Sequence, residues 1–449
     1  MVFAFTTVMA FTTVPTPLWL LYAQRDRFSS LTITVAFAVY ALAVAISLFL
    51  AGHLSDRHGR RRVLMAALAL ETLASVVFLL WPALPGLLVA RGLSGVGIGA
   101  VTATATAWLS ELHGPDPRRA QIVATGANLG GLGAGGLVSG LLAQWVTQPL
   151  RVPFLVFTAA LAVAWLALRA APETRERQAP HARYRSQRIS VPADSRGRFF
   201  AAALGAAIAF AVFGLLTSLA PSFLAGTLHQ HSHALAGAVS FAAFATAALA
   251  QALTASRPTP QLVTAAIPAL LTGLGLMTIA VWLASPSLGL FLAGDVIVGA
   301  GCGLTFKSAI ATASEAAAEE HRAEALAGIF LAAYLGLSVP VIGIGALTQI
   351  ASVRVSLLVF AGLLAAGILA AAPSLLGRRG GRPTSQPQPA SAERSNHVPH
   401  RTQDNPARPH RHRDHPRRVR RLGDRRRRLG VRLGTAGRRG VDRRDPSRA

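Results

Sequence analysis

Long apolar runs constrain this chain more than any other feature. A helix needs about 20 mainly apolar residues to cross a hydrocarbon core of about 30 Å, and the chain of 449 residues holds twelve runs of this kind. Charged residues make up only 14% of it, fewer than in a typical soluble protein. We therefore predict an all-α membrane protein with twelve transmembrane helices. They cover residues 1–22, 31–51, 63–81, 84–108, 121–146, 152–169, 199–220, 234–256, 261–284, 287–310, 324–349 and 355–376.

The first predicted helix contains Pro15 and Pro17. A proline has no backbone N–H, so a carbonyl of the preceding turn loses its helical partner. Transmembrane helices tolerate this loss because neighbouring helices satisfy the freed carbonyls. The segment is therefore kept as a membrane helix.

The arginines of the short loops indicate the orientation. Counted from a cytoplasmic N-terminus, the inner connections hold most of them, including eight between Arg169 and Arg198, while the outer ones hold only Arg25, Arg27, Arg151 and Arg354. Positive residues concentrate on the cytoplasmic side of membrane proteins. The pattern predicts a multi-pass protein with both termini in the cytoplasm. One lysine against 43 arginines indicates GC-rich DNA and a bacterial source, so the predicted location is a bacterial inner membrane.

The six helices on either side of a central loop are related. The loop 170–198 is polar and rich in arginine, and it reads as a linker. Shifting Arg91–Glu111 by 204 residues onto Asp295–Glu315 aligns three glycines and a Ser-Glu pair. We therefore predict two homologous six-helix halves, 1–169 and 199–376.

The tail from residue 377 to 449 holds 22 arginines against six acidic residues, so most of the formal net charge of +25 lies there. It has too little apolar sequence to form a core, and we predict disorder. Three interpretations stay open: a tail held to anionic lipid, non-specific binding to nucleic acid, or the product of a frameshift in GC-rich DNA. We predict no specific nucleic-acid partner.

A hydrophilic break at Gly52–Arg62 separates the second and third helices. Gly52 allows two helix ends to approach each other, and Gly59 permits a turn with positive φ. Asp56 places one negative charge among four arginines, close to a helix N-terminus where an anion is favoured. The equivalent loop of the second half, Ser256–Pro260, has no acidic residue and one arginine.

This break resembles the signature of the major facilitator superfamily, Gly-x-Leu-x-Asp-Arg-x-Gly-Arg-Arg. Pro172-Glu173-Thr174 after the sixth helix and the two six-helix halves are also similar to that superfamily, so the resemblance covers residues 1–376. In the superfamily this acidic residue belongs to a charge network that latches the cytoplasmic side in one conformation. The resemblance implies a conformational latch formed by Gly52, Asp56, Arg57, Gly59 and Arg60. The alternative is a plain positive anchor.

Arg91-Gly92-Leu93-Ser94-Gly95-Val96-Gly97 is similar to a second motif of the superfamily, whose arginine is linked to proton coupling in antiporters. Arg91, Gly95 and Gly99 share one stripe of a helix, so the glycines admit a close neighbour that the arginine also faces. The fifth helix keeps the glycines of an antiporter motif in Gly131–Gly136 but has Leu132 in place of a proline. The alternative for Arg91 is a side chain that snorkels to the interface.

Buried ionisable residues in a membrane are expensive and are candidates for function. Glu71 lies about 12 Å deep in the third helix, and Asp295 is similarly deep in the tenth. A lone carboxylate there is expected to pair with a cation, such as Asp295 with Arg91, or to take part in proton coupling. Lys307 is expected to snorkel. Asn128 is a weaker polar candidate for a central cavity, whose helices are rich in small residues and favour a neutral or amphipathic substrate.

The sequence contains no phosphate-binding loop and no nucleophile–base arrangement, so we predict neither an enzyme nor an ATP-driven pump. We expect no cofactor, and the trio His229, His231 and His233 is too weak a pattern to predict a metal. The favoured function is a monomeric, alternating-access transporter, embedded in lipid, that exports a small molecule in exchange for protons. The alternative is a non-transporting membrane sensor or scaffold that displays the basic tail.

Overall fold

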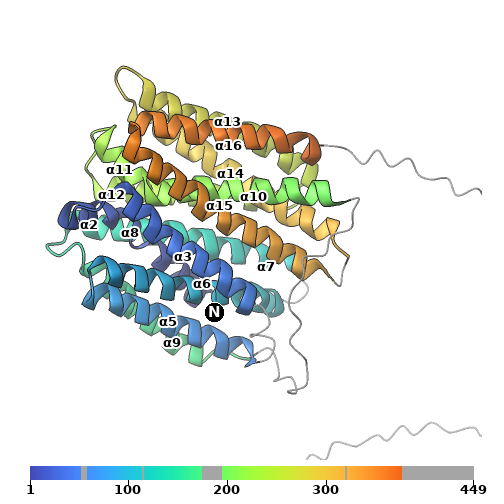
Figure 1. Ribbon diagram of the computed structural model, residues 1–449. Coiled ribbons are helices and arrows are strands. Elements are labelled where there is room, and N and C mark those ends of the chain that lie inside the picture. Colours follow the sequence, from blue (N-terminus) through green and yellow to red (C-terminus); the bar gives the residue numbers. More distant parts are fainter. Residues whose placement is uncertain (52–57, 114–115, 174–194, 319–320, 377–449) are drawn as a thin grey trace, which may run out of the picture. The chain divides into compact units, whose positions relative to one another are not determined.

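The computed structural model describes residues 1–51, 58–113, 116–173, 195–318 and 321–376. Twelve helical spans in these ranges are long and apolar enough to cross a membrane, so the predicted number is confirmed for the described part of the chain. The predicted tail at 377–449, most of the linker, and Gly52, Asp56 and Arg57 lie outside the described residues. Figure 1 shows the spans packed side by side.

The first six spans form the N-terminal half. Two of them are interrupted, the first into α1, η1 and α2, and the fifth into α7, the π-helical turn η2, and α8. The elements of this half are α1 (Val2–Thr13), η1 (Thr16–Leu18), α2 (Trp19–Asp26), α3 (Ser30–Ala51), α5 (Arg60–Leu80), α6 (Leu84–His113), α7 (Pro117–Thr125), η2 (Gly126–Gly130), α8 (Gly131–Trp145) and α9 (Val152–Arg169).

The last six spans form the C-terminal half, in which the short helix α11 follows the first span. The elements are α10 (Arg196–Ser218), α11 (Ala220–Gly226), α12 (His233–Leu253), α13 (Thr259–Trp282), α14 (Leu288–Ala316), α15 (Arg322–Ile350) and α16 (Val353–Leu376). The halves meet where α3 packs on α15 and where α8 packs on α12.

Helices α6 and α14 show the internal repeat in their packing. They begin at Leu84 and Leu288, which are 204 residues apart. In α6, Gly95 and Gly99 approach α3 while Gly97 approaches α5. The three aligned glycines of α14 repeat this pattern, because the first and third approach α12 and the middle one approaches α13 (Gly299, Gly303 and Gly301). The glycine pattern therefore encodes the same arrangement of three helices in both halves.

Close contacts at small residues join α8 to α12 where α8 ends. Gly140 lies so near the other helix that a Cβ atom on it would meet the backbone nitrogen of Gly237 at 3.3 Å. One turn further on, the side-chain oxygen of Gln144 accepts hydrogen bonds from Ser232 Oγ at 3.2 Å and from the backbone N–H of His233 at 2.9 Å. Gln144 thus binds the start of α12 and ties the two halves together at this end.

Candidate functional site

A cavity of about 80 Å³ lies where the two halves meet. None of the described side chains that line it carries a formal charge. Eight aromatic side chains dominate the lining: Phe37 and Tyr40 of α3, Phe210 and Phe213 of α10, Phe244 of α12, Phe306 of α14, and Phe330 and Tyr334 of α15. The polar side chains are Thr12, Thr13, Thr102, Asn128 and Thr217. Both halves therefore contribute to one aromatic chamber with a few neutral hydrogen-bonding groups.

The rings of the chamber pack against one another. Phe213 stacks on Phe244 with ring centroids 4.6 Å apart, and Phe210 lies 4.9 Å from Phe306. Tyr334 meets Phe210 edge to face at 5.5 Å. Such surfaces favour flat apolar or aromatic groups, which gain additional contact energy from ring stacking. The sequence did not predict this aromatic lining, because the rings come from five separate helices and no local pattern marks them.

Side chains from other helices bind the backbone at the break in the first span. Thr12 lies in the last turn of α1, and its carbonyl oxygen accepts a hydrogen bond from Arg91 Nη1 at 2.9 Å. The Val14 carbonyl oxygen accepts one from Ser139 Oγ at 2.7 Å. Helix ends leave carbonyl groups unsatisfied, and a cation is favoured at a C-terminal end. Arg91 and Ser139 therefore stabilise a discontinuous helix next to the cavity.

Arg91 also stacks on two rings of the cavity wall. Its Cζ lies 4.2 Å from the ring centre of Tyr40 and 5.3 Å from that of Phe37. Both rings belong to α3, the helix that Gly95 and Gly99 approach, so the predicted stripe faces one neighbour. The side chain is 2% exposed and does not line the cavity itself. Arg91 acts on the chamber through Tyr40, Phe37 and Thr12, which do line it.

Glu71 is buried in the N-terminal half between α5 and α6. A Cβ atom placed on Gly97 would lie 2.6 Å from Glu71 Oε1, so this glycine makes room for the carboxyl group. Ser94 and Arg91 are close enough to act on the carboxyl group electrostatically, yet neither of its oxygens has hydrogen-bonding geometry with a described residue. Glu71 is therefore a deeply buried acid that forms no ion pair with a described side chain.

Asp295 is the corresponding buried acid of the C-terminal half. It is 0% exposed, and neither carboxyl oxygen has a hydrogen-bond partner among the described residues. The expected pairing with Arg91 does not form, because the guanidinium group of Arg91 is bound to the carbonyl of Thr12 and stacked on Tyr40. Arg91 and Asp295 are aligned by the repeat, so they lie in different halves of the protein. Each side chain packs among the helices of its own half.

Asn128, the polar candidate for the central cavity, is among the chamber's lining residues. It lies in η2, a π-helical turn that leads into α8; turns of this kind often occur at functional sites. Arg91 lies behind Tyr40, Phe37 and Thr12, and Glu71 and Asp295 are not among the lining residues. Proton coupling through Arg91, Glu71 and Asp295 stays a prediction.

The described part of the predicted latch joins the start of α5 to the ends of α6 and α9. Gly59 adopts a φ of 90°, as its place in the turn predicted. Arg60 Nη2 forms an ion pair with Glu111 Oε1 at 3.0 Å. The carboxylate of Glu173 accepts hydrogen bonds from the backbone N–H groups of Arg60 and Arg61 at 2.9 and 3.1 Å. An acid therefore binds the positive N-terminal end of α5.

Arg61 makes the reciprocal contact at the end of α9. Its Nη1 donates to the carbonyl oxygens of Arg169 and Ala171, both at 3.3 Å. Sequence reasoning identified the arginines of this latch but not their partners Glu111 and Glu173. The available signals were the Ser-Glu pair that the repeat conserves and the Pro-Glu-Thr triplet after the sixth helix.

The C-terminal half has a weaker counterpart of this contact. Glu315, which the repeat aligns with Glu111, accepts a hydrogen bond from Thr259 Oγ1 at 2.9 Å at the start of α13. Arg198 Nη2 lies 4.0 Å from its other oxygen. The Thr259 hydroxyl group thus takes the place that the buried Arg60 has in the N-terminal half. This difference agrees with the sequences of the two loops, since the loop of the second half has only one arginine.

We predicted that Lys307 would extend its side chain to the membrane interface. The side chain is instead buried. Its Nζ donates to the carbonyl oxygens of Gln251 at 2.9 Å and Thr254 at 2.7 Å, at the C-terminal end of α12. The last carbonyls of a helix have no partner within it, and they carry partial negative charge. The ammonium group is therefore held by the carbonyl groups at the end of a neighbouring helix.

Residues 1–279 match the family model described as Major Facilitator Superfamily. The chain is 32% identical over 130 residues to the cephamycin export protein CmcT of Amycolatopsis lactamdurans, which is 27% of each protein. It is 32% identical over 111 residues to the multidrug resistance protein Stp of Mycobacterium tuberculosis (strain CDC 1551 / Oshkosh), which is 24% of this chain and 21% of Stp. The match thus spans about a quarter of the length of these relatives.

Among solved structures, the fold is similar to that of the nucleoside transporter NupG, with a TM-score of 0.64. The alignment covers 83% of this chain and 98% of NupG at 13% sequence identity. An identity this low supports the fold alone.

Proposed function

Because this chain belongs to the Major Facilitator Superfamily, we propose that it is a secondary active transporter that carries a small molecule across the membrane. The two halves rock about the chamber between them and expose it to each side in turn. The observation that carries this proposal is the chamber itself, which both halves line and which contains aromatic rings and neutral polar groups. A binding site at the junction of two moving bodies is what alternating access requires.

We also propose proton coupling and export. Glu71 and Asp295 are buried acids, one in each half, that form no ion pair with a described side chain, and a group of this kind carries a proton at lower cost than a full charge. One of them would exchange the coupling proton, and Arg91 would transmit the state of Glu71 to Tyr40 and the broken first helix. Export follows from the names of the relatives, an export protein and a multidrug resistance protein. The proposed location is a bacterial inner membrane, with both termini in the cytoplasm.

The latch is proposed to hold one conformation of the N-terminal half. Its described members Arg60, Glu111 and Glu173 fasten three helix ends together. Asp56 and Arg57 would complete it from the neighbouring loop. Breaking this contact changes how fast the two conformations exchange.

Transport in inverted vesicles tests the proposal. A pH-sensitive dye reports the dissipation of a proton gradient when members of a panel of aromatic and amphipathic compounds are added. We expect at least one compound to release protons with the natural chain. Asp56→Asn should slow this flux and Arg91→Ala should abolish it. Arg151→Ala is the matched control, because Arg151 is exposed and lies outside the site.

Two outcomes would contradict the carrier mechanism. If the natural chain moved no compound of the panel, or if Asp56→Asn and Arg91→Ala changed no flux while both proteins stayed folded, the chain would be a sensor or scaffold instead.

A further inference from the structure

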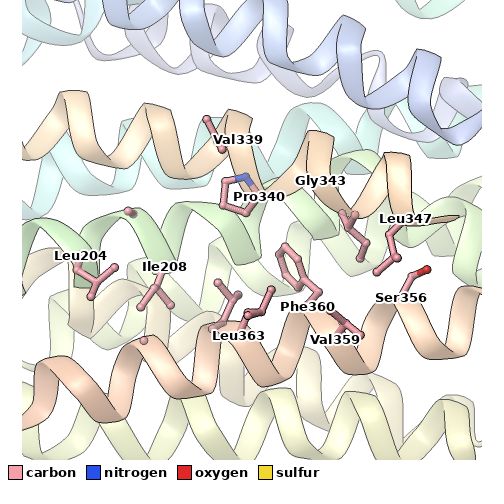
Figure 2. A pocket seen from close by; sticks show the side chains of 14 residues that line it. Leu204, Ile208, Val339, Pro340, Gly343, Leu347, Ser356, Val359, Phe360 and Leu363 are labelled. Carbon is pink, nitrogen blue, oxygen red and sulfur yellow. The ribbon is translucent and has the colours of Figure 1, made fainter. Parts of the chain in front are cut away.

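A second and larger hollow of about 450 Å³ lies on the C-terminal half, away from the central chamber. Its walls are α10, α15 and α16, as Figure 2 shows. Ile208 and Phe360 form part of its floor and are buried, whereas Val339 and Leu363 stand at its rim and are 62% and 69% exposed. The hollow is therefore a groove that opens on the outer surface of the helix bundle, and its volume is within the range of ligand pockets.

Small residues and a proline account for the groove. Gly336 packs so tightly that a Cβ atom on it would meet Ala207 Cα at 2.5 Å. Four residues later Pro340 interrupts the hydrogen bonding of α15, and a proline inside a helix kinks it. Gly343 follows on the same helix, and a Cβ atom there would meet nothing within 4 Å. The helices are thus in contact at Gly336 and leave open space beyond Pro340.

The chemistry of the lining excludes a polar ligand. Among the lining side chains Ser356 alone carries a polar group, and its hydroxyl donates to the Ser352 carbonyl oxygen at 3.1 Å within its own helix. Three membrane spans surround the groove, so the medium next to it is hydrocarbon. An alkyl chain fits both the lining and the medium.

The length of the groove matches one leaflet of a bilayer. Along α16 the lining runs from Ser356 to Gly367, about 16 Å at the rise of a helix. Half of a hydrocarbon core is about 15 Å. The groove begins near the α15–α16 connection and ends close to the middle of both helices, so it lies within the leaflet on that side.

Two residues near the α15–α16 connection are of types that are typical of a membrane interface. Arg354 is exposed and lies two residues before Ser356. Trp282, which is 47% exposed, donates from Nε1 to the carbonyl oxygen of Arg354 at 3.2 Å. Tryptophan is enriched at this level of a membrane, and arginine binds lipid phosphate there. Arg354 precedes Ser356 by about 3 Å along the helix axis, so a phosphate group bound by it would lie at the level where the groove begins.

We infer that the groove between α10, α15 and α16 binds one acyl chain of a phospholipid, whose phosphate is held by Arg354. The site is distinct from the central chamber. Helices α10 and α15 form a wall shared by the two, with Phe210 and Leu337 facing the chamber and Ile208 and Pro340 facing the groove.

Photo-crosslinking tests this inference on the full chain in nanodiscs. The probe is phosphatidylglycerol with a photoactivatable group on one acyl chain, and the labelled residues are mapped by mass spectrometry. We expect labelling at Val359 and Leu363 to exceed that at Leu155 and Val163, which are exposed on α9. Gly343→Leu should fill the groove and abolish the excess. Gly362→Leu is the matched control, because Gly362 is also exposed, has open space around it and does not line the groove.

Arg354→Gln leaves the groove open, unlike Gly343→Leu. It should lower the labelling of the groove by about fivefold when the lipid is limiting. Equal labelling of α9 and the groove would indicate ordinary surrounding lipid and overturn the inference. Unchanged labelling in Gly343→Leu, or crosslinks between two copies of the chain at Leu363, would overturn it as well. None of these readouts depends on transport, so the proposed function is tested separately.

Discussion

The carboxylate of Glu173 occupies the space in which residue 59 would carry a side chain. A Cβ atom on Gly59 would lie 2.7 Å from Glu173 Oε2. Gly59 has a φ of 90° and a ψ of 148°, a region that residues with side chains almost never adopt. The missing side chain therefore lets an acid reach the first two N–H groups of α5, and the signature glycine serves both the turn and the contact.

Gly59→Ala should destabilise the protein by about 1–3 kcal/mol, since the methyl group adds backbone strain and displaces Glu173. Thermal unfolding of the purified protein in detergent measures the change. Gly126→Ala is the control, because a Cβ atom there meets nothing within 4 Å. A melting temperature for Gly59→Ala equal to that of the control would show that the turn tolerates a side chain.

Gly95→Ala should cost about 1–3 kcal/mol, because α6 would be pushed away from α3. The added Cβ atom would lie 2.6 Å from Ala43 Cβ and 3.1 Å from the backbone nitrogen of Val44. Gly92→Ala in the same helix meets only Val39 at 3.9 Å and should be neutral or stabilising by about 0.5–1 kcal/mol. Unfolding curves measured side by side should show Gly95→Ala less stable than the natural chain and Gly92→Ala at least as stable as it. Equal stability would contradict the close packing of α6 on α3.

Substitutions of Arg91 should rank by how many of its contacts they keep. Arg91→Lys retains a donor for the Thr12 carbonyl but loses the planar stacking on Tyr40, worth about 2 kcal/mol when buried. Arg91→Ala also leaves that carbonyl without its partner, which adds about 1–3 kcal/mol. Thermal unfolding should therefore order the proteins as natural chain, lysine variant, alanine variant. An alanine variant as stable as the natural chain would mean that Arg91 does not support the broken helix.

Phe306→Leu should weaken the binding of an aromatic substrate by about 0.5–1.5 kcal/mol, because leucine fills much of the volume but offers no ring. Phe306 lies 4.9 Å from Phe210 and 5.7 Å from Phe330 in the chamber wall. The readout is the concentration of compound that gives half-maximal proton release in vesicles. Phe200→Leu, at a position 66% exposed on the outside of α10, should leave that concentration unchanged. A parallel shift in both variants would place the binding site elsewhere.

Neutral substitutions should distinguish the two buried acids. Glu71→Gln and Asp295→Asn keep size and remove the ability to ionise, and neither acid has a hydrogen-bond partner among the described residues. Both variants should fold. We expect one of them to abolish transport driven by a pH gradient and the other to retain it. Retention in both would exclude these acids as the coupling site.

Part of the contact network at the start of α5 was predictable because its residues are close together in sequence and polar where their neighbours are apolar. The turn at Gly59 and the arginines around it follow from the spacing of the motif. The partners did not follow, because Glu111 and Glu173 are about 50 and 110 residues away from Arg60. Only the packing of α5 against α6 and α9 brings those acids to the same helix end.

The chamber was harder to predict for a related reason. A membrane helix is apolar on all sides, so its sequence pattern does not show which side faces the protein. The aromatic residues of α10, α14 and α15 therefore looked like ordinary lipid-facing or core residues. Arg91, Glu71 and Asp295 were identified because charge is rare in these helices, but their rarity did not show which neighbours they face.

The sequence by itself determined the twelve membrane helices, the relation between the halves and the packing of the aligned glycines, because these depend on local composition and on spacing within one helix. The tertiary structure decided that Arg91 binds the Thr12 carbonyl and not Asp295, that Lys307 binds the end of α12, and that aromatic rings from both halves enclose the chamber. The physical reason is that these contacts join helices distant in the chain, and their geometry exists only after the helices have packed.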